Sequence, residues 1–219
     1  MRNLFFLVLV CFAAACQNSG PSSPAAAAVV SELFSRFQDL APGDTLYVSN
    51  DDTPAAGADT IPLRLLWSEL DSALLQQIAY GPDSSSMVAR ALGCWTQDST
   101  RTACRIRIDQ NWWKFQYLLI YDRLGGVFTG IQPLSEFYGG EGGQIASVSW
   151  LFDRDGDGDR DLVTRSSEHM LEMPSEDTEP VESNTEEANM WQWENGGFRP
   201  VALLDSAAMV KQWVVDWGW

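Results

Sequence analysis

The chain has 219 residues and a formal net charge of −16 at pH 7, because 30 Asp and Glu residues outnumber 14 Lys and Arg residues. Nucleic acids and anionic membrane surfaces repel so acidic a protein, which excludes electrostatic binding to either. The hydrophobic fraction of 45% is ordinary for a globular protein, and the length allows one domain with a sizeable core. The 10 tryptophans are less ordinary, and the fold must bury, stack or display them.

Residues 1–15 have the composition of an export signal. They carry an early positive charge, an apolar run too short to span a bilayer, and small residues directly before Cys16. A cysteine in this place resembles the lipobox of bacterial lipoproteins, although the usual leucine three positions earlier is Ala13 here. The resemblance implies lipidation of Cys16 and, because Gln17 follows instead of Asp, transport to the outer membrane. A plain secretory signal is the alternative.

Residues 16–28 are rich in Ser, Pro and Ala, and we interpret them as a lipidated tether that leads to a single domain over residues 29–219. Two stretches at the start of that domain have apolar residues at helical spacing. The first is residues 29–40, and the second is residues 62–78, where apolar residues recur every three or four positions. The second stretch predicts an amphipathic helix whose apolar stripe packs on a sheet.

Two cysteines, Cys94 and Cys104, remain in the mature chain once the signal is removed and Cys16 is acylated. An even pair in an oxidising compartment predicts a disulfide. In an antiparallel hairpin centred on Ser99 the pair would lie directly opposite, with about 5.5 Å between the Cα atoms. A zinc site is not expected, because the only histidine, His169, lies far away in the sequence.

From Met87 onward the apolar period changes to two, which is typical of strands. Residues 113–122 are apolar on both faces and predict a central strand that the helix covers on one side. Further strands are expected over residues 104–108, 127–134, 148–152 and 162–166, and a terminal helix over residues 204–215. The fold class is therefore predicted as α+β, an antiparallel β-meander sheet with an N-terminal amphipathic helix packed on it and a short C-terminal helix.

Two segments are predicted as loops. Residues 138–143 are rich in glycine but lack the Lys and Ser/Thr of a phosphate-binding loop, so they indicate a mobile turn. This turn could lend Glu141 to a nearby metal. Residues 172–189 are rich in Asp and Glu, and we expect them to form a disordered acidic loop between strands.

Carboxylates alternate with other residues across the glycine-rich stretch 153–161. The set comprises Asp153, Asp155, Asp157, Asp159 and Asp161. Only two positive charges, those of Arg154 and Arg160, stand against these five negative ones. Hard oxygen ligands of this kind suit Ca²⁺, which takes about six to eight oxygens. The stretch therefore predicts a metal site, in which Asp159 would contribute its backbone carbonyl.

The stretch resembles the calcium loop of the FG-GAP or VCBS repeat family. That family's pattern, D-x-D-G-D-G-x-x-D followed by two hydrophobic residues, is met at every position from Asp153 to Val163. The resemblance covers residues 144–201 and implies a strand-loop-strand unit with bound calcium. An EF-hand fits less well, because Thr164 stands where its bidentate Glu would be. Since the chain has a single such loop, the propeller that serial repeats build is not expected.

Two functions are compatible with these features. The first is a lipid-anchored extracytoplasmic calcium-binding module with a structural or binding role in the bacterial cell envelope, whose partner is an unknown envelope protein or glycan and not nucleic acid. The alternative is a metal-dependent hydrolase that acts on an envelope polymer. Catalysis has little support, because His169 is the only candidate base and no G-x-S-x-G motif occurs. The simplest interpretation is a turn stabilised by calcium with no further task.

Overall fold

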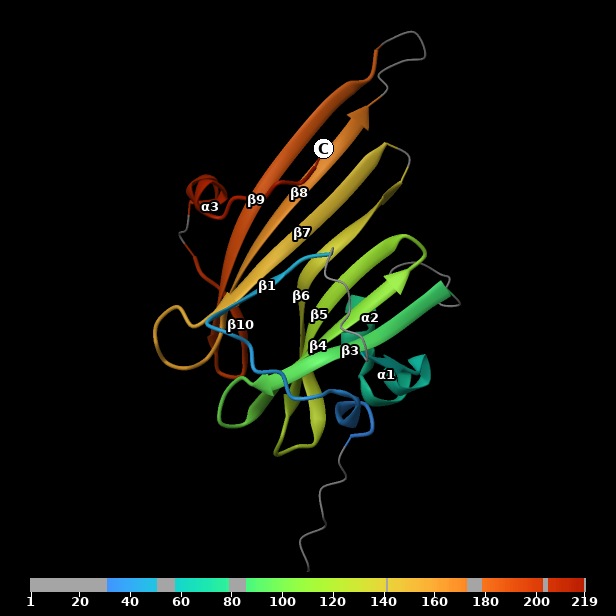
Figure 1. Cartoon of the computed structure of the whole chain (residues 1–219), viewed down its shortest axis with the longest axis vertical. Helices are drawn as coiled ribbons and strands as arrows, with labels where there is room; N and C mark the ends of the chain where they lie inside the picture. The colour runs from blue at the N-terminus through green and yellow to red at the C-terminus, as the bar shows by residue number, and fades with distance from the viewer. Residues whose placement is uncertain are drawn as a thin grey trace, which may run out of the picture.

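The structure is a computed structural model, and it describes residues 31–50, 58–78, 86–140, 142–172, 179–202 and 205–218 (Figure 1). The predicted signal peptide and tether, residues 1–15 and 16–28 with Cys16, lie outside these ranges. Strands account for 56% of the structure and helices for 15%. The predicted α+β class is therefore wrong, because the fold is mainly an antiparallel β-sheet.

Ten strands form one antiparallel sheet in the order β10-β9-β8-β7-β6-β5-β4-β3-β2, and β1 pairs with β7 off this path. Consecutive strands are neighbours along the path, so the predicted meander is confirmed. The strands are β1 (Thr45–Val48), β2 (Asp59–Ile61), β3 (Met87–Thr96), β4 (Arg101–Gln110), β5 (Trp113–Asp122), β6 (Val127–Gly140), β7 (Gly143–Phe152), β8 (Asp161–Glu172), β9 (Val181–Glu194) and β10 (Gly197–Pro200).

The predicted N-terminal amphipathic helix is also wrong. Residues 62–78 form two short helices, α1 (Leu63–Glu69) and α2 (Ser72–Ile78), which are separated at Leu70, where the backbone is extended. The second helix begins where the Asp71 carboxylate accepts a hydrogen bond from the backbone N–H of Leu74 at 2.9 Å. The leucine spacing continues through the break because both helices bury leucines on the same sheet face.

The other two helical predictions have different outcomes. Within the described part of residues 29–40 there is only a 3₁₀ turn, η1 (Phe34–Arg36). The C-terminal helix α3 (Ser206–Gln212) lies inside its predicted range, and the Asp205 carboxylate caps it by accepting from the backbone N–H groups of Ala207 and Ala208. None of the helices in the described ranges combines the length and apolar character needed to cross a membrane.

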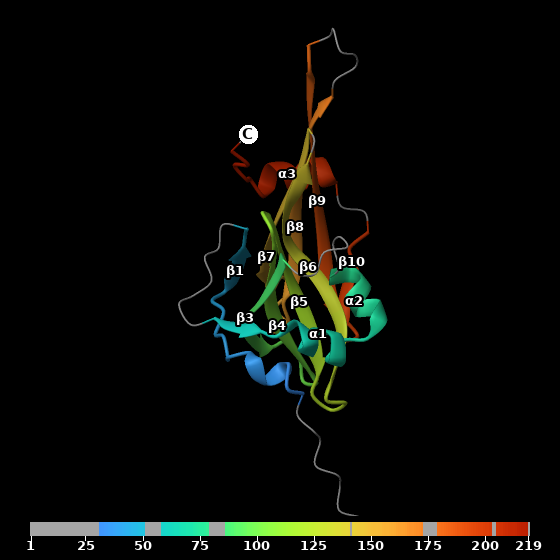
Figure 2. The ribbon, with the colours of Figure 1, turned by 90° about the vertical axis from the view of Figure 1, so that its right-hand side faces the viewer.

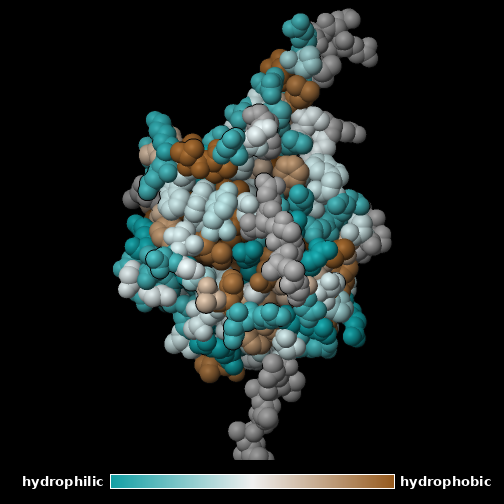
Figure 3. All heavy atoms as spheres, in the orientation of Figure 1, coloured by the Kyte–Doolittle hydropathy of each residue, from teal (hydrophilic) through white to brown (hydrophobic). Residues whose placement is uncertain are grey.

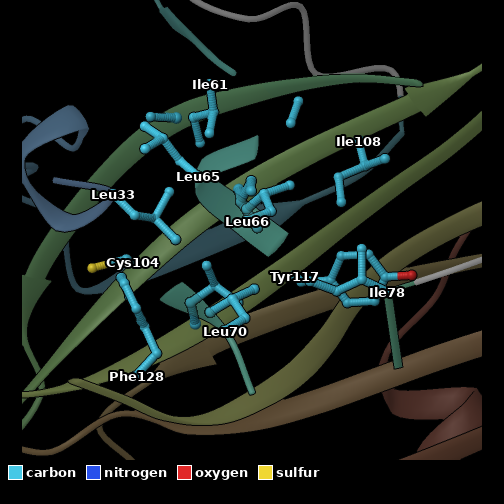
Figure 4. Packing of buried hydrophobic residues seen from close by; sticks show 14 of the residues in the cluster. Leu33, Ile61, Leu65, Leu66, Leu70, Ile78, Cys104, Ile108, Tyr117 and Phe128 are labelled. Atoms are coloured by element: carbon cyan, nitrogen blue, oxygen red, sulfur yellow. The ribbon is translucent and has the colours of Figure 1, made fainter. Parts of the chain in front are cut away.

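The largest core cluster lies between the helices and β3, β4 and β5. Figure 4 shows leucines of α1 gathered with Ile108 and Tyr117 from the sheet. In β5, Tyr117 and Leu119 belong to this cluster, whereas Leu118 and Ile120 belong to a second one on the opposite face. The prediction that this strand is central and buried on both faces is therefore confirmed.

The sheet divides where β6 and β7 separate. The two strands pair only from Phe137 to Gly140, opposite Gly143 to Ala146, and β1 takes the place of β6 beside residues 149–152 of β7. We call β2–β6 the first half-sheet, and β7–β10 with β1 the second half-sheet. Figure 2 shows α1 and α2 on one side of the sheet and β1 on the other.

The two half-sheets meet around the second core cluster. Its buried members are Val48, Trp95, Ala103, Leu118, Ile120, Leu134, Leu151, Leu162 and Trp193. Residues from both half-sheets contribute, so this cluster holds the two together through burial of apolar surface. On the face drawn in Figure 3, hydrophobic surface is broken into separate patches among hydrophilic residues.

A third cluster lies under α3 and contains Val163, Ala188 and Met209. Arg165 of β8, whose surface is 1% exposed, fixes the end of the chain beside it. Its guanidinium donates to the carbonyl oxygens of Val210 and Trp213 and pairs with Glu186 of β9. The C-terminal segment is therefore anchored to the second half-sheet.

Most of the described part of residues 172–189, predicted as a disordered acidic loop, is strand β9. The prediction was wrong because β8 supplies partners for the polar side chains of β9. Besides Glu186 and Arg165, the amide oxygen of Asn184 accepts a hydrogen bond from Ser167 at 2.7 Å. Polar composition alone therefore did not determine order in this segment.

Candidate metal centre

The aspartate-rich stretch connects β7 to β8. Phe152, the last residue of β7, lies opposite Asp161, the first residue of β8, so the loop between them closes a hairpin. The predicted strand on each side of the loop is confirmed. The loop is thus held at both ends by a paired sheet.

Three of the five predicted ligands come together. Carboxylate oxygens of Asp153, Asp155 and Asp157 lie within 4.8 Å of one another, and all three residues are exposed. Three negative charges at this distance repel one another, and a cation between them would remove that repulsion. The structure therefore contains a cluster that could hold a metal ion.

Hydrogen bonds within the loop set its shape. The carboxylate of Asp153 accepts from the backbone N–H groups of Gly156 at 2.7 Å and Gly158 at 3.0 Å. The Asp157 carboxylate accepts from the N–H of Asp159 at 2.9 Å. Gly156 and Gly158 have φ values of 81° and 93°, in the left-handed region that favours glycine. The glycines therefore let the chain wrap around the carboxylates.

Asp161 lies at the base of the loop and differs from the exposed three. It is 3% exposed, and its Oδ1 accepts a hydrogen bond from the backbone N–H of Trp193 at 2.9 Å. Its Oδ2 is buried and has no hydrogen-bond partner among the described residues. An unpartnered buried carboxylate oxygen is costly, and a bound cation would compensate it. The donor set at this loop therefore fits a hard cation.

Burial raises the pKa of the Asp161 carboxyl, and the charges of Asp155 and Asp157 act in the same direction. The hydrogen bond from the backbone amide of Trp193 opposes the rise, as does the backbone amide of Arg154 nearby. The pKa of Asp159 is likewise raised, first by burial and then by the charge of Asp157. Without a cation, the loop therefore disfavours the ionised form of both carboxyls.

The side chain of Asp159 is outside the three-carboxylate cluster. It lines a shallow pocket of about 500 Å³ with Asp98, Asp157 and Trp193. Asp98 comes from the turn between β3 and β4, so two acidic turns face each other here. The side chain of Asp159 therefore does not belong to the metal cluster. The prediction for Asp159 was that its backbone carbonyl, and not its side chain, is the ligand.

Several hydrogen bonds join the loop to residues that are far away in the sequence. No local pattern in the sequence predicts these hydrogen bonds. The Gln192 amide donates to Asp155 at 2.8 Å and ties the loop to β9. Arg160 donates to the carbonyl oxygens of Pro42 at 3.2 Å and Gly43 at 2.7 Å, just before β1, and to that of Leu151 at 3.1 Å. The loop is therefore joined to three other segments.

The turn between β3 and β4 supports the same region. The indole N–H of Trp193 donates to Asp98 at 3.1 Å, and the side chain of Gln97 donates to the carbonyl of Arg160 at 2.8 Å. Hydrogen bonds from the backbone of Thr100 and Arg101 outweigh the effect of partial burial and lower the pKa of Asp98. Asp98 therefore stays ionised and available as an acceptor for Trp193.

The suggested contribution of Glu141 concerns a residue outside the described ranges. Its neighbours Gly142 and Gly143 are at the start of β7, whereas Asp153 follows its end. Ten strand residues span about 30 Å. His169 lies opposite Gln144 at the same distant end, where its ring contacts Glu182 at 2.6 Å. The described neighbours of Glu141 and the histidine are therefore remote from the metal loop.

The two cysteines lie where the hairpin predicted, with Cys94 directly opposite Cys104. The backbone N–H and C=O of Cys94 bond to Gln38 and Leu40 instead of β4, so the cysteines form a non-hydrogen-bonded pair, a kind in which the Cα atoms are typically about 4.5 Å apart. Both are buried free thiols, so the predicted disulfide is not formed in the structure. Burial raises the pKa of Cys104, while its hydrogen bond to Cys94 lowers the pKa of Cys94.

Comparison with protein-family models, with curated proteins and with solved structures finds no match to this chain. The loop's own residues therefore carry the indication of its role. Of these, the exposed cluster of Asp153, Asp155 and Asp157 and the buried Asp161 oxygen point most directly to a ligand.

Proposed function

We propose that this chain is a lipid-anchored, extracytoplasmic module of the bacterial cell envelope, and that Ca²⁺ bound by residues 153–161 stabilises it. The carboxylate cluster together with the unpartnered oxygen of Asp161 carries the proposal. All these donors are oxygens, which Ca²⁺ prefers. The similarity of the loop to FG-GAP and VCBS repeats supports the same ion.

The proposed ion has a structural task. Asp153, Asp155 and Asp157 would supply carboxylate oxygens from one side, and Asp161 would supply its Oδ2 from the base of the loop. Because Asp155 is bonded to Gln192 and Asp161 to the backbone of Trp193, holding these carboxylates also holds β9 against the hairpin of β7 and β8. Calcium would therefore stabilise the second half-sheet as a unit.

The proposed location rests on the sequence of residues 1–28. Acylation of Cys16 would attach the domain to the outer membrane through the tether, and an envelope protein or glycan would be its partner. Expression of the full chain in a Gram-negative bacterium tests the anchor. The parent should fractionate with outer membranes, and Cys16→Ala should not. Equal fractionation of both would contradict lipid anchoring.

Thermal unfolding of the purified domain tests the metal site. The unfolding temperature should be higher in millimolar Ca²⁺ than in EGTA, because a ligand that binds only the native state stabilises it by mass action. Mg²⁺ should stabilise less, because it demands a stricter octahedral geometry and releases its waters reluctantly.

A double variant and a matched control make this test specific. Asp153→Ala with Asp157→Ala should abolish the calcium-dependent shift, because it removes two of the three clustered carboxylates. Glu187→Ala removes a carboxylate from the exposed part of β9 and should leave the shift intact. Equal unfolding temperatures in calcium and EGTA for the parent domain would refute calcium binding at this loop.

A further inference from the structure

A second cavity lies where β6 and β7 separate, away from the metal loop. Its volume is about 360 Å³, within the range of about 300–1,000 Å³ for small-molecule sites. Residues at the end of β1, in β5–β7 and in the C-terminal segment form its walls. The division of the sheet into half-sheets therefore creates the space.

Lys114 supplies a positive charge to this cavity. It is one of only two lysines in a chain of net charge −16, and it is partly buried. Its ammonium lies 5.9 Å from the centroid of the Phe137 ring, and no carboxylate among the described residues forms an ion pair with it. Since a partly buried cation gains from a nearby anion, this one favours an anionic group in the cavity.

Asn50 lines the same cavity. Its amide nitrogen donates to the carbonyl of Ser147 at 3.4 Å, and its Oδ1 is buried without a hydrogen-bond partner among the described residues. Asp216 also lines the cavity, which favours a donor that carries a positive charge.

A hydrogen bond from β5 holds the segment that carries Asn50. Gln116 is fully buried, and its amide donates to the carbonyl of Ser49 at 2.6 Å. Gln116 follows Lys114 by two residues and so shares its face of β5. The chain carrying Asn50 is thus fixed to the strand that carries Lys114, as a pre-formed binding site requires.

We propose that this cavity binds a small organic carboxylate of the amino-acid type. The carboxylate would pair with Lys114, the ammonium would pair with Asp216, and an apolar side chain would lie along Tyr47 and Phe137. These three features match an apolar α-amino acid better than a simple fatty acid or an amine. The proposal does not depend on the metal loop, because no lining residue of the cavity belongs to residues 153–161.

Isothermal titration of the purified domain with three related probes tests the ligand class. L-Phenylalanine carries the carboxylate, the ammonium and an apolar ring; phenethylamine lacks the carboxylate, and 3-phenylpropanoate lacks the ammonium. Phenylalanine should bind most tightly, and loss of the carboxylate should weaken binding by roughly 10- to 100-fold, as loss of a charge-assisted hydrogen bond does. Phenethylamine binding as tightly as phenylalanine would overturn the proposal.

Substitution of the lysine separates this site from non-specific binding. Lys114→Met keeps an unbranched apolar side chain but removes the charge, so phenylalanine should bind it at least about tenfold more weakly. The control is Lys211→Met, which removes the other lysine from the exposed face of α3 and should not change affinity. Unfolding temperatures of both variants establish that they are folded. No heat of binding to the parent, or unchanged affinity in Lys114→Met, would refute the site.

Discussion

The carboxylate of Asp161 accepts a hydrogen bond from the backbone N–H of Trp193 at 2.9 Å and thereby joins the first residue of β8 to β9. The bond uses only one of its two oxygens. The other is buried and without a partner among the described residues, on the same loop as the three exposed carboxylates of the cluster. Asp161 therefore combines a structural contact with an unused acceptor, and the two can be separated experimentally.

Asp161→Asn should weaken calcium binding by at least about tenfold without unfolding the domain. The amide oxygen can still accept from Trp193, so the contact with β9 is preserved. The amide nitrogen replaces Oδ2 and cannot bind a cation. In EGTA the variant should be at least as stable as the parent, because burial disfavours the ionised carboxyl that the substitution removes.

Calcium titrations by calorimetry and urea unfolding in EGTA together measure both effects. Asp161→Ala is the comparison, because it removes both oxygens and should lose stability even in EGTA. If Asp161→Asn bound calcium as tightly as the parent, the buried oxygen would not be a ligand. The exposed cluster would then have to account for binding alone.

Arg160→Ala should destabilise the domain even without metal. The guanidinium donates to four carbonyl oxygens on two segments, those of Pro42, Gly43, Asp44 and Leu151. Loss of hydrogen bonds from a charged donor costs about 1.5 to 3 kcal/mol. Urea unfolding in EGTA should show this loss as a lower midpoint with an unchanged slope.

The control for Arg160 is its neighbour Arg154, which is exposed on the same loop. Arg154→Ala removes the same charge and should change the unfolding free energy by less than about 0.5 kcal/mol, as surface substitutions usually do. Similar losses in both variants would show that charge, and not the bonds of Arg160, stabilises the loop.

Local patterns in the sequence predicted the features that depend on neighbouring residues. The period-two pattern identified β5 as a central strand, and a hairpin centred on Ser99 placed Cys94 opposite Cys104. The alternating aspartates likewise placed a cation-binding cluster between two strands. Each of these features is determined by spacing within a short stretch of chain.

Features that depend on distant partners were missed. The leucine spacing continues across α1 and α2, so it concealed the break that Asp71 makes by capping the second helix. The acidic composition of β9 suggested disorder, because the sequence does not indicate that Arg165 and Ser167 lie opposite. The bond from Gln192 to Asp155 likewise exists only because β9 folds back beside the loop.

Oxidation of Cys94 and Cys104 should stabilise the domain if it is exported. A non-hydrogen-bonded antiparallel pair brings side chains close, so the two thiols can join with little movement of the backbone. A bridge that closes so short a loop contributes about 2 to 3 kcal/mol. For a domain of this size, reduction should then lower the unfolding temperature by about 4 to 12 °C.

Thiol quantification in denaturant, before and after reduction, measures the redox state of protein isolated from an oxidising compartment. The expected result is no reactive thiol before reduction. The double variant Cys94→Ala with Cys104→Ala is the control, and its unfolding temperature should not respond to reductant. Two reactive thiols in protein isolated from the envelope would contradict the disulfide and leave the buried thiol pair as the native state.

Glu136→Gln should stabilise the domain at neutral pH and have little effect in acid. Burial opposite Phe115 raises the pKa of Glu136 above its ordinary value of 4.5 in the folded state. The protonated form therefore favours folding, and this contribution is complete below pH 4.5 and is lost as the pH rises through the folded-state pKa. Glutamine resembles the protonated acid at every pH, so it keeps the contribution. Each unit by which the folded-state pKa of Glu136 is raised corresponds to about 1.4 kcal/mol of unfolding free energy.

Urea unfolding across this pH range in EGTA measures the difference, and Glu187→Gln on the exposed part of β9 is the matched control. A stability difference that stays constant with pH would show that Glu136 acts through packing instead of its charge.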